Sequence, residues 1–403
     1  MTEVLKEGWK YWRFDEMATM VNDRIDKPSS ADVEYYVGLE HLDPDSLKIR
    51  RWGSPSDVGA TKLLFKKGDI IFGRRRVYQR KVAVADFDGI CSAHAMVLRA
   101  CPDVVQPEYL PYFMQSDLFM ERAKEISVGS LSPTINWKTL AKEQFLLPPL
   151  EEQKEYVKVL SAMENCINTK EILIRETERL KKRLMKNLFT KGIGHTEFEH
   201  NEGIGMIPKT WVTTNFANTN LFHIIMGQSP PSSSYNDSGY GLPFIQGVTE
   251  FGNKHPIISK YCSKPLKVAK EGDILISVRA PVGEVNIALC DVCIGRGISA
   301  IHCIDQNLTD YTINYIESHI DYLHRIAAGS IFEAITKQDL QTFIIAIPPQ
   351  EEIKQVNKLL SKIATILTNA YEDIAATKLI KMKLINQIFT NGDTIIKQSG
   401  GNR

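Results

Sequence analysis

The residue types that most directly suggest chemistry are Cys290 and Cys293, which form a Cys-x-x-Cys motif. Zinc usually takes four protein ligands in structural sites, so such a site would need a second pair at a suitable spacing. Cys262, His302 and Cys303 are nearby in the sequence but form no second Cys-x-x-Cys or His-x-His pair. We therefore expect no metal site and interpret these cysteines as thiols of strands and loops. A thiol or zinc hydrolase built on Cys290 and Cys293 is the enzyme alternative.

The common catalytic and nucleotide-binding motifs are absent from the sequence. Gly68 and Gly73 have the spacing of a phosphate-binding loop, but Arg74 follows where that motif needs lysine. The segment Ser229-Pro230-Pro231-Ser232 lacks the acidic or amide residue and the aromatic residue of amino-methyltransferases. No H-E-x-x-H or G-x-S-x-G sequence is present. The sequence therefore predicts neither catalytic residues nor a cofactor.

A dense basic cluster follows an expected strand in the first half of the chain. It consists of Arg74, Arg75, Arg76, Gln79, Arg80 and Lys81, with the aromatic Tyr78 among them. Arginine can contact phosphate groups and guanine edges, and glutamine can read adenine. The cluster predicts a DNA-contacting hairpin, and a solvated charged turn is the alternative.

The second half offers fewer charges and more polar loops. The residues there that could contact bases or phosphates are Gln228, Ser229, Gln246, Arg279 and Arg296. Residues 195–346 contain 10 basic and 15 acidic side chains. A segment of net charge −5 would bind DNA weakly by itself, because phosphate neutralisation supplies much of the affinity. Either the acidic charge lies away from the DNA, or partner subunits supply most of the positive field.

The residues named above lie in the two copies of an internal repeat. Residues 148–192 align with residues 348–392 without a gap over 45 positions, of which 15 are identical. More weakly, Gly68 and Asp69 match Gly272 and Asp273, and 129–131 match 329–331. Such self-similarity identifies two copies of one module. Each copy is a globular part of about 150 residues followed by a long helical segment.

Both helical segments show apolar spacings that alternate between four and three residues, as in the seam of a coiled coil. Expected seam residues are Leu160, Met163, Ile167, Ile174, Thr177, Leu184 and Leu188 in the first copy and Leu360, Ile363, Leu367, Ile374, Thr377, Leu384 and Ile388 in the second. A Pro-Pro-x-Glu-Glu sequence suits the start of each helix, and Gly192 and Gly392 suit its end. The seams favour one intramolecular coiled coil over two unrelated surface helices.

The globular halves have the pattern of mixed α/β domains. Expected strands are 62–65, 70–74, 81–85 and 95–99 in the first half, and 273–278, 285–289 and 298–302 in the second. A helix is expected from about 107 to before 129, and another over 309–328. The fold class is therefore α/β, with two α/β domains separated by two long antiparallel helices. The expected boundaries are 1–147, 148–194, 195–346, 347–392 and a tail at 393–403.

Composition is that of an ordinary globular protein. The 403 residues carry a net charge of +1 and are 43% hydrophobic. We find no run of eighteen apolar residues and no signal peptide at the start, so we expect no membrane span. Seven scattered cysteines are most simply reduced thiols, which predicts a cytoplasmic protein.

This order of segments resembles the specificity subunit of type I restriction–modification enzymes. Pro148-Pro149-Leu150-Glu151-Glu152-Gln153 and its continuation to Gly192 are similar to the central repeat of that family, whereas the second copy carries Ile353 in place of glutamine. The segment from Gly205 to Trp211, followed by 227–230 and 242–245, resembles the opening of a second target recognition domain. The segment 272–279 is also typical of these domains.

The resemblance implies that 1–147 and 195–346 are target recognition domains, each reading one half of a bipartite, asymmetric sequence in double-stranded DNA. The helices would set the spacing and bind two methyltransferase (modification) subunits. Restriction subunits, which are ATP-dependent endonucleases, would join through these. The chain itself would be non-catalytic, because adenine methylation belongs to the modification subunit.

Two further interpretations stay open beside the enzyme alternative. One is a coiled-coil scaffold whose globular halves bind proteins. The other is a specificity subunit of a modification-only or phage-defence system, since a restriction subunit leaves no motif in this chain.

Overall fold

The computed structural model describes residues 6–328 and 334–398 and divides into two compact units. The first unit combines Met1–Glu171 with Glu372–Arg403, and the second is Ile172–Tyr371. Each unit contains one α/β part and a portion of both long helices. The weak match between 129–131 and 329–331 falls partly outside the described residues.

In the first unit, most expected strands and helices are present. Its elements are β1 (Lys10–Arg13), α1 (Phe14–Met17), β2 (Ala18–Val21), β3 (Arg24–Ile25), β4 (Tyr35–Val37), β5 (Lys62–Phe65), β6 (Ile70–Gly73), β7 (Val82–Val84), β8 (Gly89–Ser92), β9 (Ala95–Ala100), α2 (Tyr109–Gln115), α3 (Asp117–Glu125), α4 (Trp137–Leu140) and β10 (Gln144–Leu147). The single helix expected after Pro107 is broken at Ser116, whose extended backbone and hydroxyl cap the start of α3.

The second unit repeats this order with additions. Its elements are β11 (Phe198–Asn201), β12 (Gly205–Pro208), β13 (Val212–Asn215), β14 (Phe222–Met226), β15 (Tyr235–Asn236), β16 (Leu242–Ile245), β17 (Tyr261–Cys262), β18 (Val268–Ala269), β19 (Ile274–Ser277), β20 (Val285–Ile287), β21 (Val292–Ile294), β22 (Ile298–Cys303), α6 (Asn307–Ser318), α7 (Ile320–Ala328), α8 (Lys337–Gln341) and β23 (Ile344–Ile347). The helix expected over 309–328 is again two helices, α6 and α7.

The two α/β parts share one topology. The sheet β2-β9-β6-β7 of the first corresponds to β14-β22-β19-β20 of the second. In the other sheet, β4 runs parallel to β8 as β16 runs parallel to β21. The first and last strands also pair equivalently, β1 with β10 and β13 with β23. The duplication therefore extends through the globular halves, although their sequences differ.

The long helices are α5 (Leu150–Lys191) and α9 (Gln350–Gln398). At about 1.5 Å per residue, α5 spans roughly 60 Å. Gly192 follows α5 with a φ of +63°, as expected of a residue that ends a helix. The corresponding prediction for Gly392 is wrong, because α9 continues through it to Gln398.

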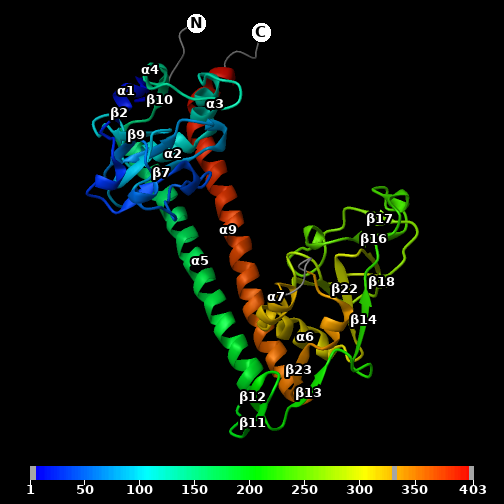
Figure 1. The fold of residues 1–403 in the computed structure, drawn as a ribbon. Coiled ribbons are helices and arrows are strands. Elements are labelled where there is room, and N and C mark those ends of the chain that lie inside the picture. The colour runs from blue at the N-terminus through cyan, green and yellow to red at the C-terminus, as the bar shows by residue number, and fades with distance from the viewer. Residues whose placement is uncertain (1–5, 329–333, 399–403) are drawn as a thin grey trace. The chain divides into compact units, whose positions relative to one another are not determined.

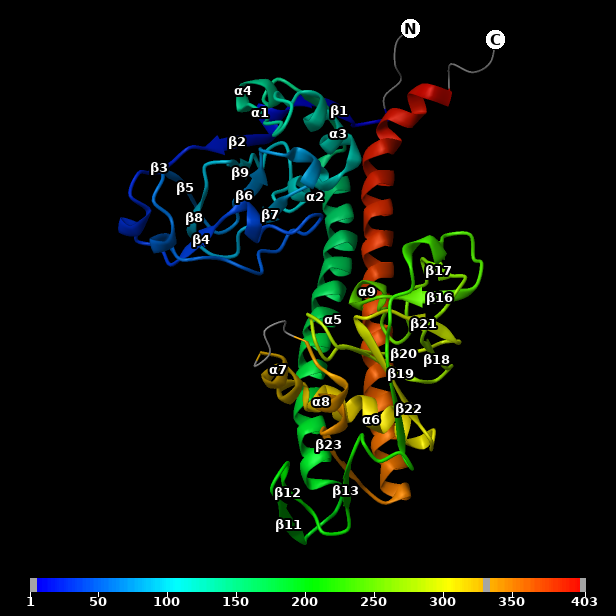
Figure 2. The ribbon, with the colours of Figure 1, turned by 45° about the vertical axis from the view of Figure 1, so that its right-hand side comes forward.

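Every expected seam residue is buried or half-buried in its own unit. Ion pairs show that the helices run antiparallel: in the first unit Lys170 meets Asp373 at 2.6 Å and Lys381 meets Glu164 at 2.6 Å. In the second unit, the Tyr371 hydroxyl donates to Glu178. Figures 1 and 2 show α5 and α9 as neighbouring helices.

Each hydrophobic core includes residues from both helices. In the first unit Leu160 of α5 and Phe389 of α9 pack with Tyr109 and Phe113 of α2. In the second unit Phe189 of α5 packs on α6, and residues of the start of α9 join the same core. Figure 1 shows α6 between α9 and the sheet that contains β22. The ends of the helices are therefore parts of the domain cores.

Equivalent tryptophans connect each α/β part to the start of a helix. The Trp9 indole N–H donates to Glu152 at 3.2 Å, and that of Trp211 donates to Glu352 at 3.0 Å. The two glutamates belong to the recognised repeat, but the tryptophans are 202 residues apart, so a comparison at a shift of 200 misses them.

A lysine lies in the seam of α9 between Thr377 and Leu384, where a buried ion pair accommodates it. The Lys381 side chain is only 4% exposed, and its ammonium lies 2.6 Å from Glu164 and 5.6 Å from the centre of the Tyr112 ring. Its sequence equivalent Lys181 instead pairs with Glu317 at 3.2 Å. A charge can occupy the seam here because a carboxylate is buried with it.

Replacing Glu164 by glutamine leaves the Lys381 ammonium buried without a counter-charge. We expect Glu164→Gln to lower the free energy of unfolding by about 3–5 kcal/mol. The double variant Glu164→Leu, Lys381→Met removes both charges and is expected to be at least as stable as the wild type. Urea denaturation of the full chain measures both variants. A double variant as unstable as Glu164→Gln would show that the charges themselves are required.

Candidate nucleic-acid interface

The structure brings together the residues that the sequence singled out in the second half. Gln246 follows β16, Arg279 follows β19 by two residues, and Arg296 lies between β21 and β22. All three side chains are exposed, and they line one depression of about 260 Å³. This volume is below the ~300–1,000 Å³ of typical small-molecule pockets. The depression is open, and the polar side chains of Gln246, Arg279 and Arg296 line it, which suits the edge of a larger ligand.

Backbone contacts hold these loops close to one another. The Arg296 amide donates to the Ser229 hydroxyl at 3.2 Å, and the Gln228 amide donates to the Ile294 carbonyl at 3.0 Å. A Cβ atom at Gly297 would lie 2.4 Å from the carbonyl oxygen of Gln246, so only glycine permits this approach. The five residues predicted in this half therefore belong to one group of adjoining loops.

The guanidinium groups of Arg279 and Arg296 form no ion pair with a described residue. Exposed arginines without a partner can bind phosphate or a guanine edge, and Gln246 beside them can read adenine. The acidic residues of this unit do not line the depression. The sequence left two explanations open for the net negative charge of residues 195–346. At the depression the first one holds, because the acidic side chains lie away from it.

The basic cluster of the first unit divides into two groups. The first group serves the protein itself: Arg80 forms ion pairs with Asp45 at 2.6 Å and Asp117 at 2.9 Å, and Lys81 donates to the Leu39 carbonyl at 2.6 Å. Arg80 also adopts a left-handed backbone with a φ of +53°. These two cations are already neutralised or bound, so they contribute little to an interface with DNA.

The second group, Arg74, Arg75 and Arg76, faces the loop 128–134. Arg75 and Arg76 both donate to the Ser132 hydroxyl, at 3.4 and 3.3 Å. The backbone of Arg75 also forms an antiparallel β-bridge with that of Thr134. Arg76 has a φ of +58°. The Nε of Arg74 is buried and has no hydrogen-bond partner among the described residues. These contacts consume only part of the hydrogen-bonding capacity of three guanidinium groups.

The positive charge of this region acts on the neighbouring His94. Burial lowers the pKa of His94, and the nearby Arg75, Arg74 and Lys62 lower it further. Lys62 and His94 could not be assigned to this region from the sequence, because they come from separate segments of the chain. Tyr78 is half exposed, and Gln79 is half-buried.

The cysteine motif does not form a centre of its own. Burial raises the pKa of Cys293 to about 12, and burial also raises the pKa of the half-buried Cys290. Such thiols remain protonated near neutral pH, which disfavours both nucleophilic attack and metal binding. Within residues 6–328 and 334–398, no group of three or more His, Cys, Asp or Glu side chains is arranged to hold a metal ion.

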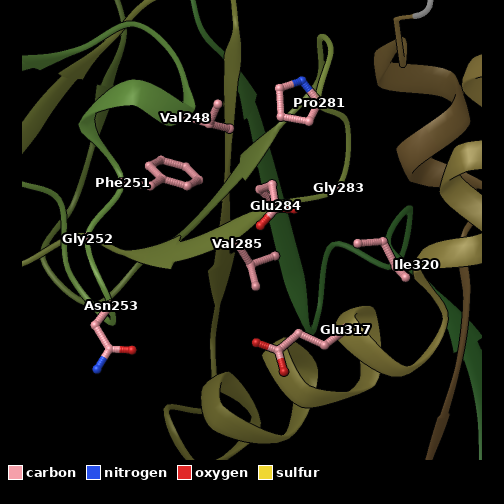
Figure 3. A pocket seen from close by; sticks show the side chains of 10 residues that line it. All are labelled: Val248, Phe251, Gly252, Asn253, Pro281, Gly283, Glu284, Val285, Glu317 and Ile320. Atoms are coloured by element: carbon pink, nitrogen blue, oxygen red, sulfur yellow. The ribbon is translucent and has the colours of Figure 1, made fainter. Parts of the chain in front are cut away.

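A larger pocket of about 450 Å³ also lies in the second unit. Figure 3 shows Glu284 and Glu317 among the side chains that line it, together with Phe251 and Pro281. Glutamates and apolar groups form this wall, with no lysine or arginine. The pocket is therefore unsuited to phosphate groups, although it adjoins the depression of Gln246 and Arg279, since Val248 lines both.

The two α/β parts are thus copies of one module with different polar residues on corresponding loops, which is the architecture of a protein that recognises a ligand in two parts. A model of the type I restriction modification DNA specificity domain matches residues 57–179 and 208–388. The chain therefore belongs to the type I restriction–modification specificity family.

Individual relatives agree with this assignment. The putative type I restriction enzyme MjaX specificity subunit of Methanocaldococcus jannaschii is 36% identical over 96% of this chain and 94% of its own. The type I restriction enzyme EcoDI specificity subunit of Escherichia coli is 28% identical over 38% of this chain and 34% of its own.

Solved structures agree as well. A chain from a study of complex assembly and conformational transition in a type I restriction–modification system is 30% identical, with a TM-score of 0.62 over 97% of this chain and 99% of that one. The type I S subunit from M. genitalium is 13% identical, with a TM-score of 0.59 over 96% and 97%, and shows the shared fold alone.

None of the helices among the described residues has the length and apolar character needed to cross a membrane.

The division of the basic residues predicts that Arg80 contributes to the stability of the fold and Arg279 does not. Arg80→Ala leaves Asp45 and the Gln115 carbonyl without their donors, and we expect the free energy of unfolding to fall by about 2 kcal/mol. Arg279→Ala removes an exposed side chain and should change it by no more than about 0.5 kcal/mol. Urea denaturation of the two variants tests the division. A strongly destabilised Arg279→Ala would show that Arg279 supports the fold.

Proposed function

We propose that this chain is the DNA sequence-specificity subunit of a type I restriction–modification complex, with each α/β part reading one half of a bipartite, asymmetric target. The observation that carries the proposal is the duplication itself. Two modules of one topology present different side chains at corresponding strand ends, in a chain of this family. Because the side chains differ, the two half-sites should differ.

Polar residues on the strand-end loops of each module would read the DNA in its grooves. In the second unit these are Gln246, Arg279 and Arg296, with Gln228 and Ser229 on the adjoining loop. In the first unit they are Arg74, Arg75, Arg76 and Gln79. Arginine favours guanine and phosphate, and glutamine favours adenine. Arg80 and Lys81 would support this surface without contacting DNA.

The long helices would set the distance between the half-sites and bind the partners. Val159 of α5 and its repeat equivalent Leu359 of α9 are both exposed, as are Leu180 and its equivalent Ile380. Equivalent apolar residues on two repeated helices suit two copies of one partner, for which we propose the methyltransferase subunits. Restriction subunits would join through these. The catalytic groups and cofactors would then reside in the partners, and this chain would have no catalytic role.

Methylation by the assembled complex tests the reading function. The chain is co-expressed with its methyltransferase in a host free of DNA methylation, and modified bases are detected by sequencing. A split, asymmetric motif methylated once on each strand is expected. The variant Gln246→Ala, Arg296→Ala should relax one half of that motif and leave the other unchanged, whereas the control Lys264→Ala should leave both halves unchanged.

A stable complex with no methylation would contradict the proposal. If no complex with the methyltransferase forms at all, the scaffold interpretation gains support instead.

The spacer role predicts a change in the gap alone. Deleting residues 171–177 of α5 together with 371–377 of α9 removes one heptad from each helix and keeps the seam in phase. The loss of about 10 Å should shorten the gap between the half-sites by roughly three base pairs, with both half-sites retained. Methylation sequencing measures the gap.

A control deletion of 172–174 with 372–374 breaks the alternation of four and three residues and should destabilise the chain without producing a new motif. Altered half-sites in the heptad variant would show that the helices do more than set a distance.

A further inference from the structure

Arg75 and Arg279 occupy the same place in the two modules. β6 pairs with β9 from Ile70 onward as β19 pairs with β22 from Ile274 onward, a shift of 204 residues. The same shift relates Arg75 to Arg279. A comparison of the sequences at the helix shift of 200 does not align these arginines.

The backbone around each arginine is also held in the same way. Arg75 forms an antiparallel bridge with Thr134, and Arg279 forms one with Ala334. The preceding residue accepts an equivalent hydrogen bond in each module: Arg74 from the Ile135 amide and Val278 from the Ile335 amide, both at 2.9 Å. Each arginine is therefore placed by two separate segments of its module.

The surroundings of the two arginines differ. Arg75 is flanked by Arg74 and Arg76, whereas Arg279 is flanked by Val278 and Ala280 and shares its depression with Gln246 and Arg296. Gln246 has no counterpart in the first module, where Val37 of β4 and Gly38 are adjacent. Ile245 corresponds to Val37, because each is the last residue of its strand in the parallel pairing. Gly247 corresponds to Gly38, because the amide of each donates to the side chain of the residue three positions later.

A residue that is the same in both modules cannot distinguish two different half-sites. Its task must be one that both half-sites share, and the group that every DNA sequence presents is the backbone phosphate. An arginine that is held at a strand end beside further cationic groups suits that group, because phosphate contacts fix the register of a protein on the duplex.

We infer that Arg75 and Arg279 are equivalent phosphate anchors, one in each module, that bind duplex DNA without reading its sequence. The discrimination between half-sites then falls to residues that the modules do not share, including Gln246 and Arg296. This inference rests on the proposed function and assigns different tasks to residues of the same site.

Single variants of the full chain in complex with the methyltransferase test the inference. The probes are a duplex that contains the motif found by methylation sequencing and a duplex of the same length without it. Arg75→Ala and Arg279→Ala are each expected to weaken binding to both duplexes by the same factor, on the order of tenfold, and to reduce the slope of log affinity against log salt by about 0.9. The methylated motif should not change. Arg24→Ala, which removes an exposed arginine of the first unit, is the control.

Lysine variants separate a phosphate contact from a base contact. A lysine supplies the same charge but not the planar pair of donors that guanine requires. Arg75→Lys and Arg279→Lys should therefore retain most of the affinity, the salt slope and the motif. Relaxed specificity at one base position in the lysine variants would overturn the inference and identify the arginines as base-reading residues.

Two further outcomes of the binding measurements distinguish a failure of the inference from a failure of the proposed function. If the wild-type complex shows a preference for the motif but both alanine variants bind like it, the phosphate-anchor inference fails alone. If the wild-type complex shows no preference between the two duplexes, the proposed function fails together with it.

Discussion

The structure depends on a shared burial: the core of each unit is completed by the start of one long helix and the end of the other. Phe389 of α9 packs on Tyr109 and Phe113 in the first unit, and Phe189 of α5 packs on Tyr311 and Tyr315 in the second. Removing a buried phenylalanine typically costs about 3–5 kcal/mol, so each α/β part relies on both helices. The spacer role proposed for the helices depends on this packing at both ends of each helix.

The duplication preserves this framework while its details vary. Glu152 and Glu352 accept from Trp9 and Trp211 in the same manner. The neighbouring position differs: Gln153 is buried and bonds the Gln106 amide and the carbonyls of Val104 and Pro148, whereas Ile353 is buried in an apolar core. Each choice is consistent with its surroundings, because a buried amide needs partners and a buried isoleucine does not.

In the loops, the hydrogen-bond partners separate residues proposed to contact DNA from residues that support the fold. Gly297 allows the backbone of Gln246 to lie close to the loop that contains Arg296. In the first unit, Arg80 instead links separate segments through ion pairs with Asp45 and Asp117. Arginines of similar sequence context therefore have different tasks. The exposed ones remain available to a polyanion, and the paired ones stabilise the surface that presents them.

The sequence by itself determined the repeat, the seam of both helices, the loops of the second module and three of the four strands in each of the sheets β2-β9-β6-β7 and β14-β22-β19-β20, because hydrophobic periodicity and turn residues are local signals. Local signals also misled: Gly392 resembles a helix end, yet α9 continues beyond it. Only the tertiary structure separated Arg80 and Lys81 from Arg74, Arg75 and Arg76, since their partners lie 35 or more residues away in the sequence. It also revealed the equivalence of Arg75 and Arg279, because strand pairing preserves a position in space when insertions have shifted it in the sequence.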